Sequence, residues 1–223
     1  ATRLSYFLWR SRPDDELNRL ADEGRLSDPD ILHAQVERML NDPKNDRFVN
    51  EFLDQWLNLD QIDATTPDSY LYPEYDDVLR RAMLAETQHF FGHLIDRDLP
   101  IANLIDSEFT FLNRKLAEHY GITGVKGETM RKVQLDAGSI RGGILTHASI
   151  AKVTANGTVT TPVKRGNFVL TNLLGLPPNP PPPSVGSIEP DTRGATTIRE
   201  TLEKHQQIEA CAVCHRQIDP PGF

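Results

Sequence analysis

The chain has 223 residues, of which 38% are hydrophobic and 25% charged, as in an ordinary globular protein with room for one large or two small domains. Its formal net charge of −8 argues against a nucleic-acid-binding protein and against a polybasic module for membrane surfaces. No run of eighteen apolar residues occurs, so no transmembrane segment is expected.

Apolar residues recur at helical spacing through residues 1–120, which predicts helices joined by short turns. The first ten residues are typical of an amphipathic helix rather than of a signal peptide. Asp28, followed by a proline, marks the start of a later helix. A long helix is expected at about residues 73–96, and a short one that ends at Gly121.

After Gly121 the chain becomes rich in glycine and proline. The elements predicted there are a strand at residues 130–135 and helices at residues 142–150, 162–174 and 196–206, with Thr161 as the cap of the second helix. The prolines of residues 177–183 favour a stiff strap over the protein's own surface, and a ligand for an SH3-like domain is the alternative.

These patterns predict a mainly α fold. We expect a helical N-terminal domain at residues 1–122, followed by a smaller, Gly/Pro-rich domain at residues 123–223.

The strongest motif lies at the carboxyl end, where Cys211, Cys214 and His215 form a Cys-x-x-Cys-His sequence. This is the attachment signature of c-type haem. The two thiols add to the two vinyl groups of one haem, and three residues of helix bring them to one side. His215 is then carried beneath the iron, where an imidazole nitrogen can coordinate it. Because the chain has no other cysteine, the motif predicts one covalent haem c in the second domain.

Three other readings of the cysteines are weaker. A Cys-x-x-Cys redox pair belongs in a βαβ context, which is lacking here. A zinc site needs four ligands, and only His205 stands near the motif as a candidate fourth. A structural disulfide across two intervening residues is geometrically awkward.

The second ring nitrogen of His215 needs an acceptor, and we expect a backbone carbonyl of residues 218–221. For the opposite side of the iron His147 is the favoured ligand, because small residues flank it and would let it approach a flat macrocycle. A buried, hydrogen-bonded histidine is the alternative for His147. Met130, His205 and His119 are further candidates, and an open site or a ligand outside these residues also remains.

Lys164 and Arg165 follow the expected helix start at Thr161. Two cations and a helix N-terminus attract carboxylates, so these residues are candidates for binding the haem propionates. An ordinary solvated basic turn is the alternative. Arg141 and Arg216 are further candidates on the same argument.

Glu86, His89 and His93 share one face of the long predicted helix. Glu-x-x-His is half of a di-iron motif, and His-x-x-x-His can bind zinc. The complementary half is missing, so a solvated polar face is favoured. Signatures of hydrolases and phosphate-binding loops are absent as well.

Several motifs together resemble the planctomycete-type cytochrome proteins, exported chains built from domains of unknown function around c-type haem sites. The matching segments are RLSYFLW at residues 3–9, PDDEL at 13–17, FTFLN at 109–113, HYGI at 119–122, GILTHAS at 143–149, TPVKRG at 161–166, NLLG at 172–175, CAVCH at 211–215 and IDP at 218–220. The resemblance implies two adjacent domains, one helical and one haem-bearing, and it implies no particular reaction. Similar chains continue past the IDP segment, so further domains of a longer protein are expected.

The favoured function is a c-type cytochrome module that transfers electrons with an unidentified redox partner protein. A haem enzyme with an open distal site and an interaction scaffold with structural haem are the alternatives. Covalent haem attachment takes place outside the cytoplasm, so an extracytoplasmic location is expected.

Overall fold

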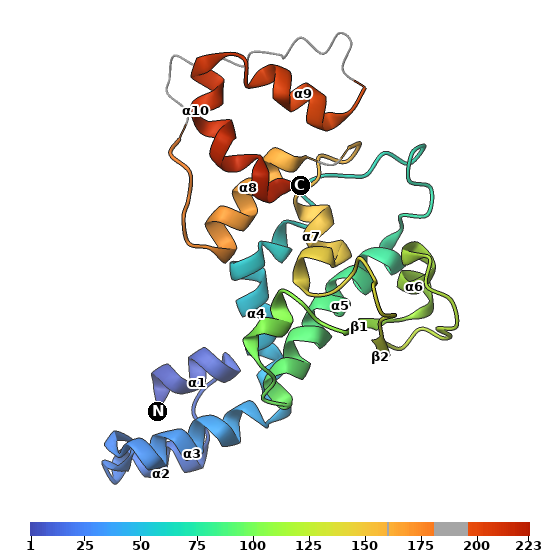
Figure 1. Ribbon diagram of the computed structural model, residues 1–223. Coiled ribbons are helices and arrows are strands. Elements are labelled where there is room, and N and C mark those ends of the chain that lie inside the picture. Colours follow the sequence, from blue (N-terminus) through green and yellow to red (C-terminus); the bar gives the residue numbers. More distant parts are fainter. Residues whose placement is uncertain (160, 181–195) are drawn as a thin grey trace. The chain divides into compact units, whose positions relative to one another are not determined.

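The computed structural model describes residues 1–159, 161–180 and 196–223. These residues are mainly helical and contain one two-stranded sheet (Figure 1), which confirms the mainly α fold class. The chain forms two compact units. Unit 1 comprises Ala1–Ala64 and Tyr72–Val153, and unit 2 comprises Thr65–Leu71 and Thr154–Phe223.

The regular elements of unit 1 are α1 (Thr2–Trp9), α2 (Asp15–Asp22), α3 (Pro29–Leu40), α4 (Asp46–Leu57), α5 (Asp77–Asp96), β1 (Phe109–Leu112), α6 (Arg114–Tyr120), β2 (Arg131–Gln134) and α7 (Ala148–Val153). Short 3-10 turns lie between them at Arg25–Ser27, Pro43–Asn45, Leu59–Gln61, Ile101–Leu104 and Ile144–Thr146.

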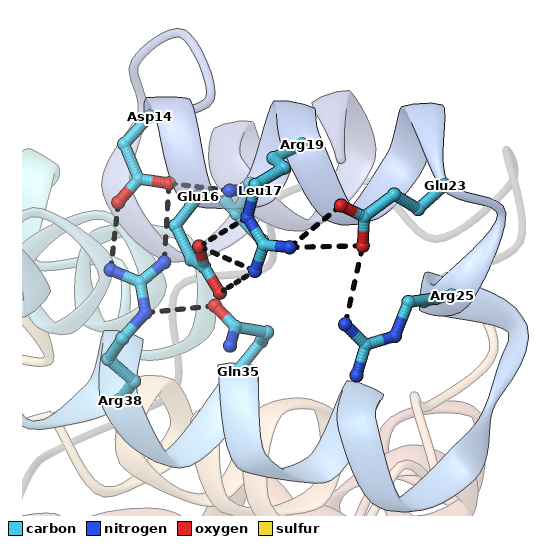
Figure 2. A network of polar contacts seen from close by, with 8 residues as sticks. All are labelled: Asp14, Glu16, Leu17, Arg19, Glu23, Arg25, Gln35 and Arg38. Carbon is cyan, nitrogen blue, oxygen red and sulfur yellow. Dashed lines mark hydrogen bonds and ion pairs between the residues drawn. The ribbon is translucent and has the colours of Figure 1, made fainter.

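The first three helices pack around Trp9, which is almost wholly buried. Its indole nitrogen donates to the carbonyl of Met39 at 3.0 Å. Asp14 caps α2 by accepting from the amide of Leu17 at 3.0 Å, and Arg38 of α3 donates to both carboxylate oxygens of Asp14 at 2.8 and 3.2 Å (Figure 2). One aspartate therefore starts a helix and ties that helix to its neighbour.

A second apolar cluster joins α5 to α6, to α7 and to the strands. Its buried residues include Leu79 and Met83 of α5, Leu112 of β1 and Leu116 of α6. The strands pair antiparallel, with Phe109 opposite Gln134. Of this pair, β1 lies against α5 (Figure 1). The expected strand at residues 130–135 is thus confirmed, whereas its partner was not predicted.

Two predicted elements of unit 1 differ in detail. The long helix begins at Asp77 rather than near residue 73, because the side chain of Asp76 caps it by accepting from the amide of Leu79. The helix predicted at residues 142–150 is wrong as a single element. The backbone at His147 is extended, with φ −69° and ψ 140°, and separates a 3-10 turn from α7.

The elements described in unit 2 are α8 (Pro162–Phe168), a π-helical turn at Val169–Leu173, α9 (Ile198–His205), α10 (Glu209–Ile218) and a final 3-10 turn at Pro220–Gly222. Thr197 forms a reciprocal capping box with Glu200 at the start of α9. Thr161 stands at the N-cap position of α8 with Pro162 in the first turn, as predicted, but its hydroxyl donates to the carbonyl of Thr154 and makes no capping hydrogen bond. The proposed proline strap lies partly outside the described residues.

Candidate functional site

Helix α10 carries the three residues of the Cys-x-x-Cys-His motif. Both cysteines are free thiols; Cys211 is 4% exposed and Cys214 is half-buried. Residues three apart on a helix lie on neighbouring positions of one face. His215 follows directly, with 18% of its side chain exposed. The helix therefore presents two sulfurs and an imidazole in the order that the sequence predicted.

A carboxylate holds the ring of His215. Nδ1 lies 3.0 and 3.2 Å from the two oxygens of Asp219, one helical turn later. A carboxylate only accepts hydrogen bonds, so Nδ1 carries a proton, and in the neutral imidazole Nε2 is then the nitrogen with the lone pair. We had expected a backbone carbonyl of residues 218–221 as the acceptor. That expectation is wrong, because the side chain of Asp219 turns back onto the helix instead.

Asp219 is itself fixed in place. It is 3% exposed, and Gln206 donates from Nε2 to its Oδ2 at 2.9 Å. Gln206 caps the carboxyl end of α9, so this contact ties the end of α9 to the end of α10.

His205, the last residue of α9, lies beside His215. The ring centroids are 4.6 Å apart at an interplanar angle of 66°. Nδ1 of His205 is buried and has no hydrogen-bond partner among the described residues. Burial, and then the neighbouring His215, lower the pKa of His205. The chain reversal that this contact requires is supplied by the short turn between the two helices.

Two glycines bring α8 into backbone contact with the end of α10. A Cβ atom on Gly166 would lie 1.8 Å from the carbonyl oxygen of Ile218, and one on Gly222 would lie 2.0 Å from that of Pro162. Neither position tolerates a side chain without a backbone shift. No packing role was predicted for these glycines from the sequence, although a glycine inside a helical pattern, as at Gly166, is a signal of close packing.

Lys164 and Arg165 lie on the same helix as Gly166. Lys164 is exposed, and helical geometry places it about 200° around the axis from Gly166. Arg165 is half-buried. Their expected contact with haem propionates stays a prediction, as does that of Arg216, which pairs with Glu209 at 3.5 Å.

His147 lies in unit 1, where it is 2% exposed. Its Nδ1 lies 2.9 Å from the hydroxyl of Thr87, and Phe90 meets its ring edge-on. Nε2 is buried without a hydrogen-bond partner in the described part of the chain. Burial, and then Arg141, lower the pKa of His147 to about 3, which leaves the imidazole neutral. Its expected role as an iron ligand stays a prediction.

Glu86, predicted to belong to a solvated polar face, is buried at 1% exposure, and that prediction is wrong. Its carboxyl group accepts from the hydroxyls of Thr110 at 2.7 Å and Tyr120 at 2.5 Å and from the amide of Ala148 at 3.3 Å. Burial raises the pKa of Glu86 to about 7, although these hydrogen bonds oppose the shift. The missed signal is its place in the apolar stripe of α5, between Met83 and Phe90.

The two histidines predicted to share that face with Glu86 contact other residues. His89 is exposed and stacks on Phe111, with centroids 5.9 Å apart. Nε2 of His93 lies 3.1 Å from Nζ of Lys132. Throughout the described residues no group of three His, Cys, Asp or Glu side chains is placed to hold a metal ion.

Met130 and His119, the other candidate ligands, both belong to unit 1. Met130 packs at the edge of the second apolar cluster. His119 lies 3.6 Å from Glu74, and burial lowers its pKa. Arg141 stacks over the ring of Tyr120 at 3.5 Å and donates to the carbonyl of Thr146. In the described part of the chain no helix combines the length and apolar character needed to cross a bilayer.

Two family models match the chain. PSD4, a protein family of unknown function (DUF1592), matches residues 1–122. PSCyt3, also of unknown function (DUF1588), matches residues 141–223, which include α10. These matches are consistent with the resemblance to planctomycete-type cytochrome proteins. The division after residue 122 into two domains stays a prediction.

Neither a curated protein nor a solved structure matches the chain significantly. The PSD4 match covers more than half of the 223 residues. The chain therefore belongs to the PSD4 family of proteins of unknown function (DUF1592), and its residues 141–223 match the PSCyt3 model.

Proposed function

We propose that the chain is a c-type cytochrome module that carries one covalent haem and transfers electrons within a larger exported protein. The observation that carries the proposal is the arrangement at His215. Its Nδ1 is held by Asp219, so Nε2 keeps its lone pair for a metal, directly after two free thiols on the same helix.

The residues of α10 fit a haem. Cys211 and Cys214 stand at the spacing that thioether attachment to one porphyrin needs. A buried nitrogen of His205 without a partner among the described residues lies next to His215, so polar binding capacity there is unsatisfied. The cytochrome-like name of the PSCyt3 family adds support.

Each residue has a separate task in this proposal. The two cysteines anchor the group, and Asp219 holds the tautomer and the orientation of His215. Gly166 and Gly222 keep the turn that carries Asp219 against α8. When bound, the haem supplies a one-electron iron couple, so the module accepts one electron from a redox partner protein and passes one on.

An extracytoplasmic location belongs to the same proposal, because haem is joined to Cys-x-x-Cys-His motifs outside the cytoplasm. The redox partner is a further domain of the same protein or a separate one. The negative net charge of the chain favours a partner with a basic surface.

The proposal is tested by spectroscopy on the chain exported from a host that attaches haem c. We expect a ferric low-spin spectrum that cyanide and azide leave unchanged, and a reversible one-electron titration. A high-spin spectrum that shifts on adding these anions would instead support a haem enzyme with an open distal site. The paired control is Cys211→Ala with Cys214→Ala, which should yield colourless protein.

A further inference from the structure

The most deeply buried charged group near the candidate site is the carboxylate of Asp219. Its side chain is only 4% exposed. Among the described residues, its one ion-pair partner within 4.0 Å is the ring of His215. Gln206 is neutral and donates a single hydrogen bond to it. The negative charge of Asp219 therefore depends on His215 for compensation.

Burying a charge is costly unless an opposite charge faces it at close range. A neutral imidazole offers Asp219 a hydrogen bond but no formal positive charge. The same imidazole with a cation on Nε2 draws electron density from its Nδ1–H and becomes a stronger donor. A more positive metal at Nε2 would therefore compensate the negative charge of the carboxylate better than a less positive one.

We propose that Asp219 is a positioning residue that tunes His215 into a strongly electron-donating ligand and so favours the ferric over the ferrous form of the bound iron. This inference rests on the proposed function and adds the direction in which the protein shifts the reduction potential. A neutral backbone carbonyl in the same place would pull less on the Nδ1 proton.

The fold prevents the carboxylate from moving away. Asp219 closes α10, and its amide donates to the carbonyl of His215 at 2.9 Å. Two prolines follow, and then Gly222, whose backbone contacts Pro162 of α8. Gln206 holds Oδ2 from the other side. Both carboxylate oxygens consequently stay within 3.2 Å of Nδ1.

The test compares midpoint potentials of haem-loaded full chains by spectroelectrochemical titration. Asp219→Asn keeps the shape and an acceptor oxygen but removes the charge. We expect at least a tenfold loss of preference for the ferric form, which is a rise of 59 mV for a one-electron couple. The matched control is Glu209→Gln, which removes a charge from an exposed side chain at the start of α10. It should shift the potential far less.

A second variant should move the potential the other way. Gln206→Leu removes the donor that competes with His215 for the charge of Asp219, so the potential should fall. Gln206→Leu also tests the inference if Asp219→Asn fails to attach haem. The inference is overturned if Asp219→Asn shifts the potential no more than Glu209→Gln, or if Gln206→Leu raises it. Absence of haem from the wild-type chain would instead defeat the proposed function itself.

Discussion

The two units differ in what fills their interiors. Unit 1 contains two apolar clusters built from large side chains such as Trp9, Leu79 and Met83. In the described part of unit 2 the buried apolar side chains are few: Pro162, Phe168, Val169, Leu170, Cys211 and Ala212. Its other close contacts include backbone approaches at Gly166 and Gly222 and the polar contacts of Asp219 with Gln206 and His215.

This difference indicates two ways of reaching a stable fold. The burial of apolar side chains in unit 1 is the kind of interaction that drives a domain to fold. The described residues of unit 2 bury little apolar surface of this sort, and their contacts include close backbone approaches and a carboxylate held at an imidazole. A covalently attached porphyrin would supply the large apolar body that its described residues lack. Haem attachment should therefore stabilise unit 2 much more than unit 1.

The largest expected effect comes from removing both thiols. In Cys211→Ala with Cys214→Ala, amide exchange in α9 and α10 should become at least about a thousandfold faster, which corresponds to about 4 kcal/mol. Exchange in α5 should stay unchanged. Hydrogen exchange with mass spectrometry on exported wild-type and variant chains makes the comparison. Equal exchange of α10 in the two proteins would contradict the contrast between the units.

Gly166→Ala should cost about 3 kcal/mol or more of unfolding free energy in unit 2, because the new Cβ would lie 1.8 Å from a backbone oxygen. The matched control is Gly92→Ala in α5, where nothing lies within 4 Å of the added atom. Alanine there should stabilise unit 1 by about 0.5–1 kcal/mol. The unfolding free energies of both variants are measured by urea unfolding, monitored by haem absorbance and by far-ultraviolet circular dichroism. Similar effects of the two variants would show that α8 and α10 do not pack through glycine.

A pH dependence is expected in unit 1 from Glu86. Its pKa rises from 4.5 to about 7 on folding, so the folded state holds the proton longer than the unfolded state. The resulting stabilisation is complete below pH 4.5 and is lost as the pH rises through 7, at about 1.4 kcal/mol per pH unit. The stability difference between wild type and Glu86→Gln should decline over that range. If the stabilities of wild type and Glu86→Gln changed with pH in parallel, that result would contradict the burial of a titrating carboxyl group.

His147 should show the opposite sign. Its pKa falls from 6.5 to about 3 on folding, so its stabilisation is complete above pH 6.5 and is lost as the pH falls through 3. The difference between wild type and His147→Asn should therefore shrink towards acid. Between pH 4.5 and 6.5 the two groups oppose each other, and chemical denaturation of both variants against pH separates them.

The smallest expected effects come from helix caps in the two units. Asp14→Ala removes the cap of α2 and the contacts with Arg38, and should cost about 1–2 kcal/mol (Figure 2). Thr197→Ala removes an exposed capping box of α9 and should cost about 0.5–1 kcal/mol. Thermal unfolding of the two variants compares them. A larger loss for Thr197→Ala would indicate that α9 contributes more to unit 2 than its exposure suggests.

Local signals predicted much of the helical structure. Asp28 caps α3 with a proline in its first turn, and Gly121 ends α6 with a φ of 70°. These features depend on residues within one helical turn. The Cys-x-x-Cys-His motif also lies on a helix, as its spacing indicated.

Features that depend on distant residues could not be predicted in this way. The strand at Phe109–Leu112 exists because residues 131–134 pair with it. Burial of Glu86 depends on Tyr120 and Ala148, which are 34 and 62 residues away in the chain. The close approach of Gly166 to Ile218 likewise joins residues far apart in sequence. Asp219, although only four residues from His215, was missed because a backbone acceptor was expected.

The most direct measurement is the intact mass and visible spectrum of the wild-type chain after export from a host that attaches haem c. We predict the polypeptide mass plus one haem, a haem c spectrum, and no free thiol at Cys211 or Cys214. Colourless protein of unmodified mass, with both thiols reactive or bound to zinc, would contradict the proposed function.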